Sequence, residues 1–176
     1  MVDSLYRTSF SRRPLYSEFV PDTQIVGQNV VVGRAGWENQ LETNKQAFLT
    51  AWIQRSAFVS AYGALSDEAY VDTLISHTGI TFTSGERNAL VNRLVNHTAT
   101  RAQVLRQIAE DPRFKALKFN DTFVMMEYFG YLRRDADAAG LQFWLDKLNQ
   151  FHGNFEQAEM VKAFIVSDEY RNRFPQ

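Results

Sequence analysis

Three stretches of the chain repeat one pattern of apolar residues, and this repeat limits the possible fold more than any other feature. Residues 46–58, 102–114 and 158–170 align without a gap at a constant offset of 56 residues. In each stretch the first three aligned apolar residues fall at i, i+1 and i+4, as on one face of an α-helix, and the fourth follows six residues later. They are Phe48, Val104 and Met160; Leu49, Leu105 and Val161; Trp52, Ile108 and Phe164; and Phe58, Phe114 and Tyr170. The repeat predicts an all-α array of short amphipathic helices, which must pack together to bury their apolar faces.

The repeat also predicts how the chain is organised. We expect about two complete three-helix units, at residues 66–117 and 118–176, and a partial first unit at residues 1–65. The first unit carries a long insertion at residues 11–36. The units are expected to pack into one compact globular body.

The insertion reads as a connecting loop. It holds two prolines and three glycines, and Asp22 is its one candidate helix cap. Val30, Val31 and Val32 are consecutive β-branched residues, which favour an extended segment. Because one isolated strand cannot form a sheet, we predict a packed loop here.

Several helix starts carry capping residues. Asp137 can cap the helix that follows it, and Pro112 is expected to end or bend the helix before it. The capping-box spacing occurs at Thr83 and Glu86, Thr100 and Gln103, and Asn154 and Gln157.

Composition excludes several classes of function. The 176 residues carry a formal net charge of −1, with a sequence pI near 6.3. Nucleic-acid binding needs a surplus of Lys and Arg on one face, so no nucleic-acid partner is expected. There is no cysteine, which excludes a disulfide framework and any cysteine-based metal site or nucleophile. No apolar run is long enough for membrane insertion, and the polar start does not resemble a signal peptide. Either the protein is intracellular or the sequence is part of a longer one.

The loop DADAAG resembles the opening of a calcium loop, because Asp135 and Asp137 alternate before Gly140. An EF-hand loop also needs a bidentate Glu twelve residues from the first ligand, whereas Asp146 stands there within a predicted helix. Helix capping by Asp137 is the alternative interpretation. A calcium ion is the one cofactor that the sequence leaves open.

No motif of an enzyme is present. The three histidines stand near predicted helix ends, far apart in sequence, and no pair has the spacing of a metal site on a helix. The sequence has neither a Gly-x-Ser-x-Gly elbow nor a Gly-rich phosphate loop followed by Lys and Ser or Thr. We therefore expect a protein that is not an enzyme.

Aromatic residues are plentiful, and they can fill a core or stack on a sugar. All three tryptophans lie on the apolar stripes and are expected in the core. Tyr62, Tyr131 and Phe151 stand near helix ends and are expected to be partly exposed. A ligand groove would lie beside Tyr131, Trp144 and Phe151.

One stretch, residues 118–174, carries a pattern that can be compared with known families. It contains an aromatic-led helix, a turn with Asp, Gly, Leu and Trp, and a helix that ends in Ser-x-Glu-Tyr. The residues in this pattern are Gly130, Tyr131, Leu132, Arg133, Asp137, Gly140, Leu141, Trp144, Ser167, Glu169 and Tyr170. It resembles a bacterial repeat family labelled domain of unknown function 4214. The family's Leu-Gly-Arg triplet is altered here, and the similarity is weaker over residues 66–117.

The resemblance implies an all-α unit distantly similar to phycobilisome linker domains. It implies an exported or cell-surface protein, and it brings no catalytic residues. Two functions stay open. The first is a non-catalytic helical interaction module that binds a protein partner or other copies of itself, with assembly into a filament or layer. The second is a carbohydrate- or calcium-binding module of a secreted protein, with a surface glycan as its partner.

Overall fold

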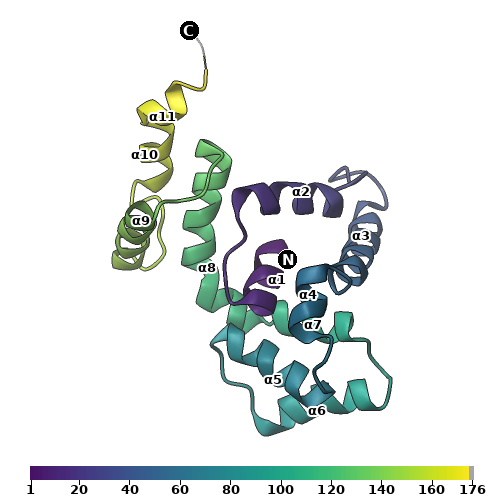
Figure 1. The fold of residues 1–176 in the computed structure, drawn as a ribbon. Helices are drawn as coiled ribbons and strands as arrows, with labels where there is room; N and C mark the ends of the chain where they lie inside the picture. The colour runs from purple at the N-terminus through teal and green to yellow at the C-terminus, as the bar shows by residue number, and fades with distance from the viewer. Residues whose placement is uncertain (175–176) are drawn as a thin grey trace. The chain divides into compact units, whose positions relative to one another are not determined.

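The structure is a computed structural model that describes residues 1–174, and within them all regular structure is helical (Figure 1). This confirms the predicted all-α class. The helices are α1 (Val2–Phe10), α2 (Tyr16–Val26), α3 (Trp37–Trp52), α4 (Ser56–Tyr62), α5 (Asp67–Thr78), α6 (Ser84–Val95), α7 (Arg101–Ala109), α8 (Pro112–Glu127), the π-helical segment η1 (Tyr128–Leu132), α9 (Ala138–Gln150), α10 (Met160–Val166) and α11 (Asp168–Arg171).

The helices form two compact units. Unit 1 comprises Met1–Pro14 and Glu18–Lys115, and unit 2 comprises Leu15–Ser17 and the chain from Ala116 onward. The grouping into three repeat units and one body remains a prediction. No helix within residues 1–174 combines the length and apolarity that crossing a bilayer requires.

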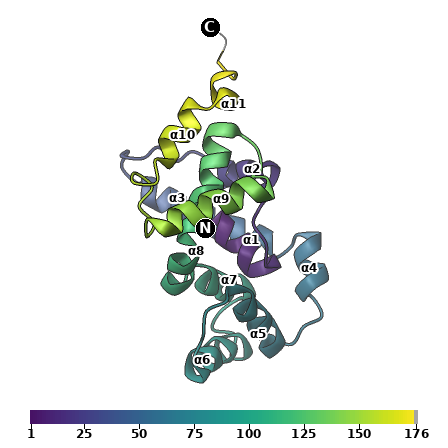
Figure 2. The same cartoon turned by 90° about the vertical axis from the view of Figure 1, so that its left-hand side faces the viewer.

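The core of unit 1 forms around its first helix, α1. This helix packs against α5 and α7, and two views show it among the other helices of the unit (Figures 1 and 2). Leu5 and Tyr6 are buried, as an apolar helix face requires. Asp3 and Arg7 are buried too, and Arg7 Nε donates to Asp3 Oδ1 at 2.8 Å. The side of α1 that carries Asp3 and Arg7 is therefore buried as well. The ion pair between these side chains offsets the free-energy cost of removing their charges from water.

Trp52 lies at the centre of this core, as predicted. The Tyr6 ring meets the Trp52 ring edge-on, with centroids 4.8 Å apart, and Trp52 Nε1 donates to Ser9 Oγ at 3.0 Å. Tyr62 is also buried, and its hydroxyl donates to the carbonyl oxygen of Ser9 at 2.5 Å. The expectation that Tyr62 is partly exposed is therefore wrong, because α1 supplies a buried acceptor for its hydroxyl.

The insertion at residues 11–36 is not a loop throughout, because it contains α2. Pro21 lies inside this helix, and Asp22 does not begin it. Instead, the buried Asp22 carboxylate accepts hydrogen bonds from Tyr6 Oη at 2.9 Å and from Arg55 at 2.6 and 2.9 Å. Val31, beyond α2, is exposed, so the expectation of a packed loop is wrong there.

Several predicted helix boundaries are confirmed. Thr83 and Thr100 form capping boxes with Glu86 and Gln103, and Asp137 caps α9. In each case the capping side chain accepts a hydrogen bond from a backbone N–H group of the first turn. This bond depends only on residues close together in sequence. Asn154 also accepts from the N–H of Gln157 at 3.0 Å, but turns follow it and α10 begins only at Met160. The predicted helix start at Asn154 is therefore wrong.

Unit 2 is built on one long helix and the segment that continues it. Residues 112–127 form α8, and the chain then widens into the π-helical segment η1. The buried apolar residues of unit 2 include Val124, Met125, Tyr128, Phe129, Leu148, Ala158, Met160 and Phe164. Val124 and Met125 take inward positions on α8, whereas Met126, the next residue, is exposed.

Candidate functional site

The predicted ligand residues Tyr131 and Trp144 meet at a shared neighbour, Phe164. The Phe164 centroid lies 5.4 Å from the Trp144 ring and 6.2 Å from the Tyr131 ring. Tyr131 belongs to η1, Trp144 to α9 and Phe164 to α10, so three segments converge here. Trp144 is only half-buried, which differs from the core position expected for it, and Tyr131 is half-buried as predicted. Phe151 is half-buried just after α9 and takes no part in the ring contacts that join Tyr131 and Trp144 to Phe164.

These rings are part of a longer series that we call the aromatic row. Its members, in order of contact, are Phe143, Trp144, Phe164, Tyr131, Tyr170 and Phe174. Neighbouring centroids lie 5.1–6.2 Å apart, within the range in which aromatic rings attract each other. Phe143 and Phe174, at the two ends, are exposed. The row is therefore buried at its centre and open at its ends.

A second aromatic surface was not predicted. Phe119 and Phe123 stand one turn apart on α8 and stack with centroids 6.4 Å apart, and Phe155 stacks on Phe123 at 5.1 Å. Phe119 is 58% exposed and Phe155 is 38% exposed. We call these three residues the outer stack. The spacing of Phe119 and Phe123 was visible in the sequence, but the long α8 that presents them was not expected.

The polar groups beside the outer stack hold the chain in place. Asn120 Nδ2 donates to Asn149 Oδ1 at 2.7 Å. The left-handed Gly153 lies so close to Asn120 that a Cβ there would be 3.0 Å from Asn120 Oδ1. The end of α9 is therefore joined to α8 by a hydrogen bond, and the turn that carries Phe155 lies against α8 through the close contact of Gly153.

The predicted metal ligands Asp135 and Asp137 are engaged by protein donors. Asp135 Oδ1 accepts from the backbone N–H of Tyr16 at 2.7 Å, within unit 2. Asp137 Oδ1 accepts from the N–H of Gly140 at 2.8 Å, and this bond and the nearby Arg134 lower the pKa of Asp137. No group of three or more His, Cys, Asp or Glu side chains placed to hold a metal ion was found in residues 1–174.

Arg134 ties this loop to the end of the chain. Its guanidinium pairs with Glu169 of α11 at 2.6 and 2.9 Å, and Arg134 Nη1 donates to the carbonyl of Asp135 at 2.9 Å. It also lies over the Tyr128 ring, 5.2 Å from the centroid. The hydrogen bond from Arg134 lowers the pKa of Glu169. The loop is thus held as a structural element.

One carboxyl oxygen in the described part of unit 2 is buried without a hydrogen bond. Glu127 is 9% exposed, and its Oε2 atom accepts no hydrogen bond from the described part of the chain. Burial raises the pKa of this carboxyl.

Unit 1 has a cavity of about 400 Å³ at the start of α7, lined by Asp67, Leu94, His97, Thr98, Ala99, Thr100, Arg101 and Gln103. Its charged groups bind each other. Arg101 Nη2 pairs with Asp67 at 2.9 Å and donates to the carbonyl of Leu65 at 2.6 Å. Thr100 and Gln103 close the capping box of α7, so the polar lining serves the fold.

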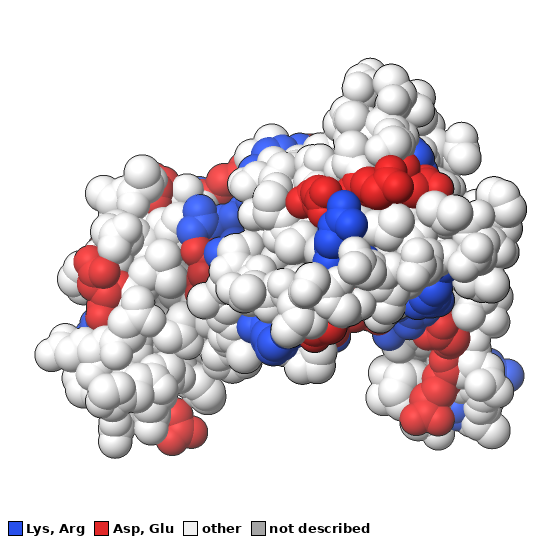
Figure 3. Space-filling model, turned by 90° about the horizontal axis from the view of Figure 1, so that it is seen from below, with Lys and Arg blue, Asp and Glu red and all other residues white. Residues whose placement is uncertain are grey.

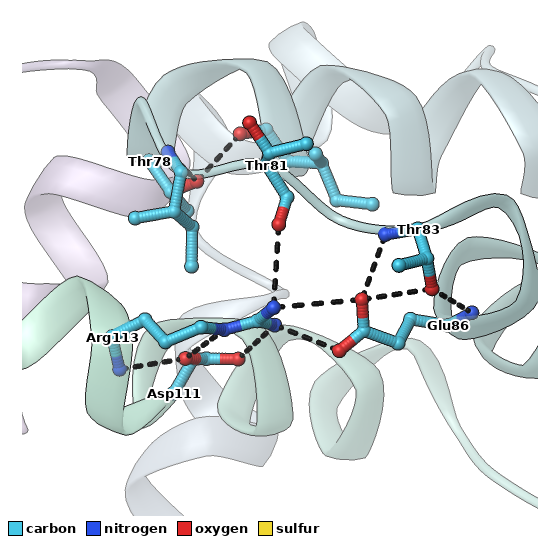
Figure 4. A network of polar contacts seen from close by, with 8 residues as sticks. Thr78, Thr81, Thr83, Glu86, Asp111 and Arg113 are labelled. Atoms are coloured by element: carbon cyan, nitrogen blue, oxygen red, sulfur yellow. Dashed lines mark hydrogen bonds and ion pairs between the residues drawn. The ribbon is translucent and has the colours of Figure 1, made fainter.

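In the polar network of Figure 4, too, the charged side chains bind each other and the ends of helices. Arg113 donates to Asp111 through Nε and Nη2, at 3.0 and 2.8 Å, and Nη2 also lies 3.1 Å from Glu86 Oε1. Glu86 in turn accepts from the N–H of Thr83 at 2.7 Å. The network joins the start of α6 to the start of α8 within unit 1. On the face drawn in Figure 3, acidic and basic groups are interspersed and form no large patch of one sign.

Comparison with known proteins identifies one part of the chain. No curated protein and no solved structure was found to match it. The model of one family, Domain of unknown function (DUF4214), matches residues 113–174. The matched residues include α9, α10 and α11, the aromatic row and the outer stack. Residues 113–174 of this chain therefore form a DUF4214 domain.

Proposed function

We propose that this chain is a non-catalytic helical interaction module of an exported or cell-surface protein, and that it associates with further copies of itself through the outer stack. The single observation that carries the proposal is the exposed series of stacked rings on unit 2, at Phe119, Phe123 and Phe155. Aromatic side chains are enriched at protein interfaces because they bury a large apolar area.

The size of the outer stack favours a weak and reversible association. Phe119 and Phe155 together leave on the order of 200 Å² of ring surface in water, given a full area of about 200 Å² for each side chain. A stable interface buries about 800 Å² per partner, so the outer stack would form the centre of a larger contact. The ordered support from Asn120, Asn149 and Gly153 keeps the rings in place and lowers the entropy cost of binding.

The charged groups support a role without catalysis. The pKa shifts of Arg134, Asp137 and Glu169 in unit 2 are explained by bonds of these groups to each other and to the backbone. Such ion-pair networks also perturb pKa values in structural settings.

Light scattering after size exclusion tests the proposal. The wild-type mass is expected to rise reversibly with concentration, and the variant with both Phe119→Ser and Phe155→Ser is expected to remain monomeric. Val59→Ser, which changes an exposed apolar residue of unit 1, is the matched control. A wild-type protein that stays monomeric up to its solubility limit would overturn self-association.

A carbohydrate is the second candidate, because exposed rings beside amide groups also suit a sugar. The Asn120 and Asn149 side chains lie next to the outer stack and supply hydrogen-bonding groups at its edge. Binding on a glycan array that is lost with Phe119→Ser and Phe155→Ser would favour a sugar ligand over another copy of the chain.

A further inference from the structure

The three aligned stretches of the chain share one local structure, which allows their equivalent positions to be compared. In each, a helix ends, a short break follows, and a second helix begins. The second helices, α4, α8 and α11, begin at Ser56, Pro112 and Asp168, which are separated by the same 56 residues as the sequence repeat. Phe58 therefore corresponds to Tyr170, and the same offset, continued four residues beyond the aligned stretches, pairs Tyr62 with Phe174.

In unit 1 these positions are covered by another helix. Phe58 and Tyr62 stack with centroids 4.5 Å apart, and they are only 3% and 2% exposed. The ring of Tyr70, from the following helix α5, meets Tyr62 edge-on at 5.5 Å and Phe58 at 6.3 Å. Tyr70 is fully buried in this contact. An amphipathic helix that presents a tyrosine therefore closes this face in unit 1.

In unit 2 the equivalent face is open. Tyr170 and Phe174 are in contact at 5.1 Å, as Phe58 and Tyr62 are, but Phe174 is 56% exposed. Ile165 is 41% exposed, whereas its counterpart in the first stretch, Ile53, is partly buried and packs against the core of unit 1. Tyr131 covers one side of Tyr170, at 5.7 Å, and leaves Phe174 open. The same kind of apolar position is thus covered in unit 1 and exposed in unit 2.

The exposed residues near this face are apolar, whereas a surface that faces water is usually polar. An apolar face on one unit of a helical array is normally covered by a neighbouring unit. Ile165, Val166 and Phe174 are all apolar and exposed on α10 and just after α11. The covered counterparts of Tyr170 and Phe174 in unit 1, Phe58 and Tyr62, show what fits such a face.

We infer that the face formed by Ile165, Tyr170 and Phe174 binds an amphipathic helix that presents an aromatic side chain, as α5 does with Tyr70 in unit 1. This inference rests on the proposed function as an interaction module, but it uses a surface other than the outer stack. The arriving aromatic ring packs edge-on against Phe174, and the apolar residues one turn later cover Ile165.

A peptide with the sequence of α5 is the probe for this site. It covers residues 66–79 and carries Ser76→Lys, so that a lactam from Asp72 holds the helix across two exposed positions. Calorimetric titration into the full chain is expected to show saturable binding of one peptide per protein. Binding should weaken by about tenfold or more with Phe174→Ser in the protein or with Tyr70→Ser in the peptide, because each change removes one aromatic ring from the contact.

Leu117→Ser is the matched control, since it changes an exposed apolar residue of unit 2 outside this face and should leave peptide binding unchanged. Circular dichroism of Phe174→Ser checks that the helices are intact. The inference is overturned if the peptide does not bind, or if Phe174→Ser and Leu117→Ser bind it equally. Self-association that depends on Phe174 without peptide binding would also overturn it, in favour of a contact between copies.

The two proposals can fail separately. The variant with Phe119→Ser and Phe155→Ser is expected to lose self-association and to keep peptide binding. Phe174→Ser is expected to lose peptide binding and to keep self-association.

Discussion

The buried carboxylate of Asp22 shows how one residue can fix several helices of unit 1. It accepts from Tyr6 of α1 and from Arg55, which precedes α4, while it belongs to α2 itself. The burial of Tyr6 and its hydrogen bond to Asp22 raise the pKa of Tyr6 to about 12. Arg55 also lies over the Trp52 ring, 4.4 Å from its centroid. The carboxylate is stable in the interior because a cation and a hydroxyl both bind it.

Arg55→Met is predicted to destabilise the protein by about 2–3 kcal/mol, because it leaves the Asp22 charge buried without its cation. The loss is placed slightly below that for a fully buried pair, since the Arg55 side chain is partly exposed. Denaturant unfolding measures it. The control is Arg87→Met, which breaks an exposed pair with Asp72 and should cost much less, because exposed ion pairs contribute little to stability. Equal losses for the two variants would contradict the role of Asp22.

Glu127 predicts a pH dependence with a definite sign. Burial raises the folded-state pKa of this carboxyl above its unfolded value. The protonated Glu127 carboxyl therefore contributes to stability below its unfolded-state pKa of about 4.3. This contribution is lost as pH rises through the folded-state pKa. Glu127→Gln should raise the stability at pH 7 by about 1 kcal/mol and change it little at pH 4. Thermal unfolding at both pH values checks this, with the exposed Glu156→Gln as control. A variant that is less stable than wild type at pH 7 would contradict it.

At the scale of single helices, Gly140 shows why the start of α9 needs a glycine. Its N–H donates to the capping carboxylate of Asp137, and a Cβ at this position would collide with the hydroxyl of Tyr128. Gly140→Ala is predicted to destabilise the protein by about 1–3 kcal/mol, because Tyr128 or the first turn of α9 must move.

Gly130→Ala is the matched control for Gly140→Ala, because Gly130 is helical and has open space around its Cβ position. It should be neutral or stabilising by about 0.5 kcal/mol. Thermal unfolding of both variants measures the difference, and similar losses would contradict the steric argument.

The same scale shows what the sequence can predict. The caps at Thr83, Thr100 and Asp137 were predicted correctly, because each depends on residues within one turn. The helix α2 was missed, because Pro21 and Asp22 suggested a boundary and the partners of Asp22 lie far away in sequence. Local patterns therefore gave the helix starts, while contacts between distant segments decided which residues are buried.

The candidate site followed the same division. Tyr131 and Trp144 were predicted to lie together, and they do share Phe164 as a neighbour. Phe119 and Phe155 were missed, because their contact through Phe123 requires the turn before α10 to return to α8. The spacing of residues in the sequence does not predict that this turn contacts α8.

For the molecule as a whole, the division into two compact units predicts how it unfolds. Each unit has its own set of buried residues, with Trp52 and Tyr70 in unit 1 and Tyr128 and Phe164 in unit 2. Units that each bury a core of their own often unfold in separate steps. We therefore predict that scanning calorimetry of the full chain resolves two transitions, of which the larger belongs to unit 1.

Two substitutions assign these transitions, because each acts on the core of one unit. Arg55→Met removes the partner of Asp22 in unit 1 and should lower the midpoint temperature of the larger transition only. Gly140→Ala disturbs Tyr128 in unit 2 and should lower the midpoint temperature of the smaller transition only. The double variant should show both shifts without further loss, since distant changes in separate cores are additive within about 0.5 kcal/mol. If either single substitution moves the whole calorimetric profile, the two cores unfold as one cooperative structure and the division has no energetic meaning.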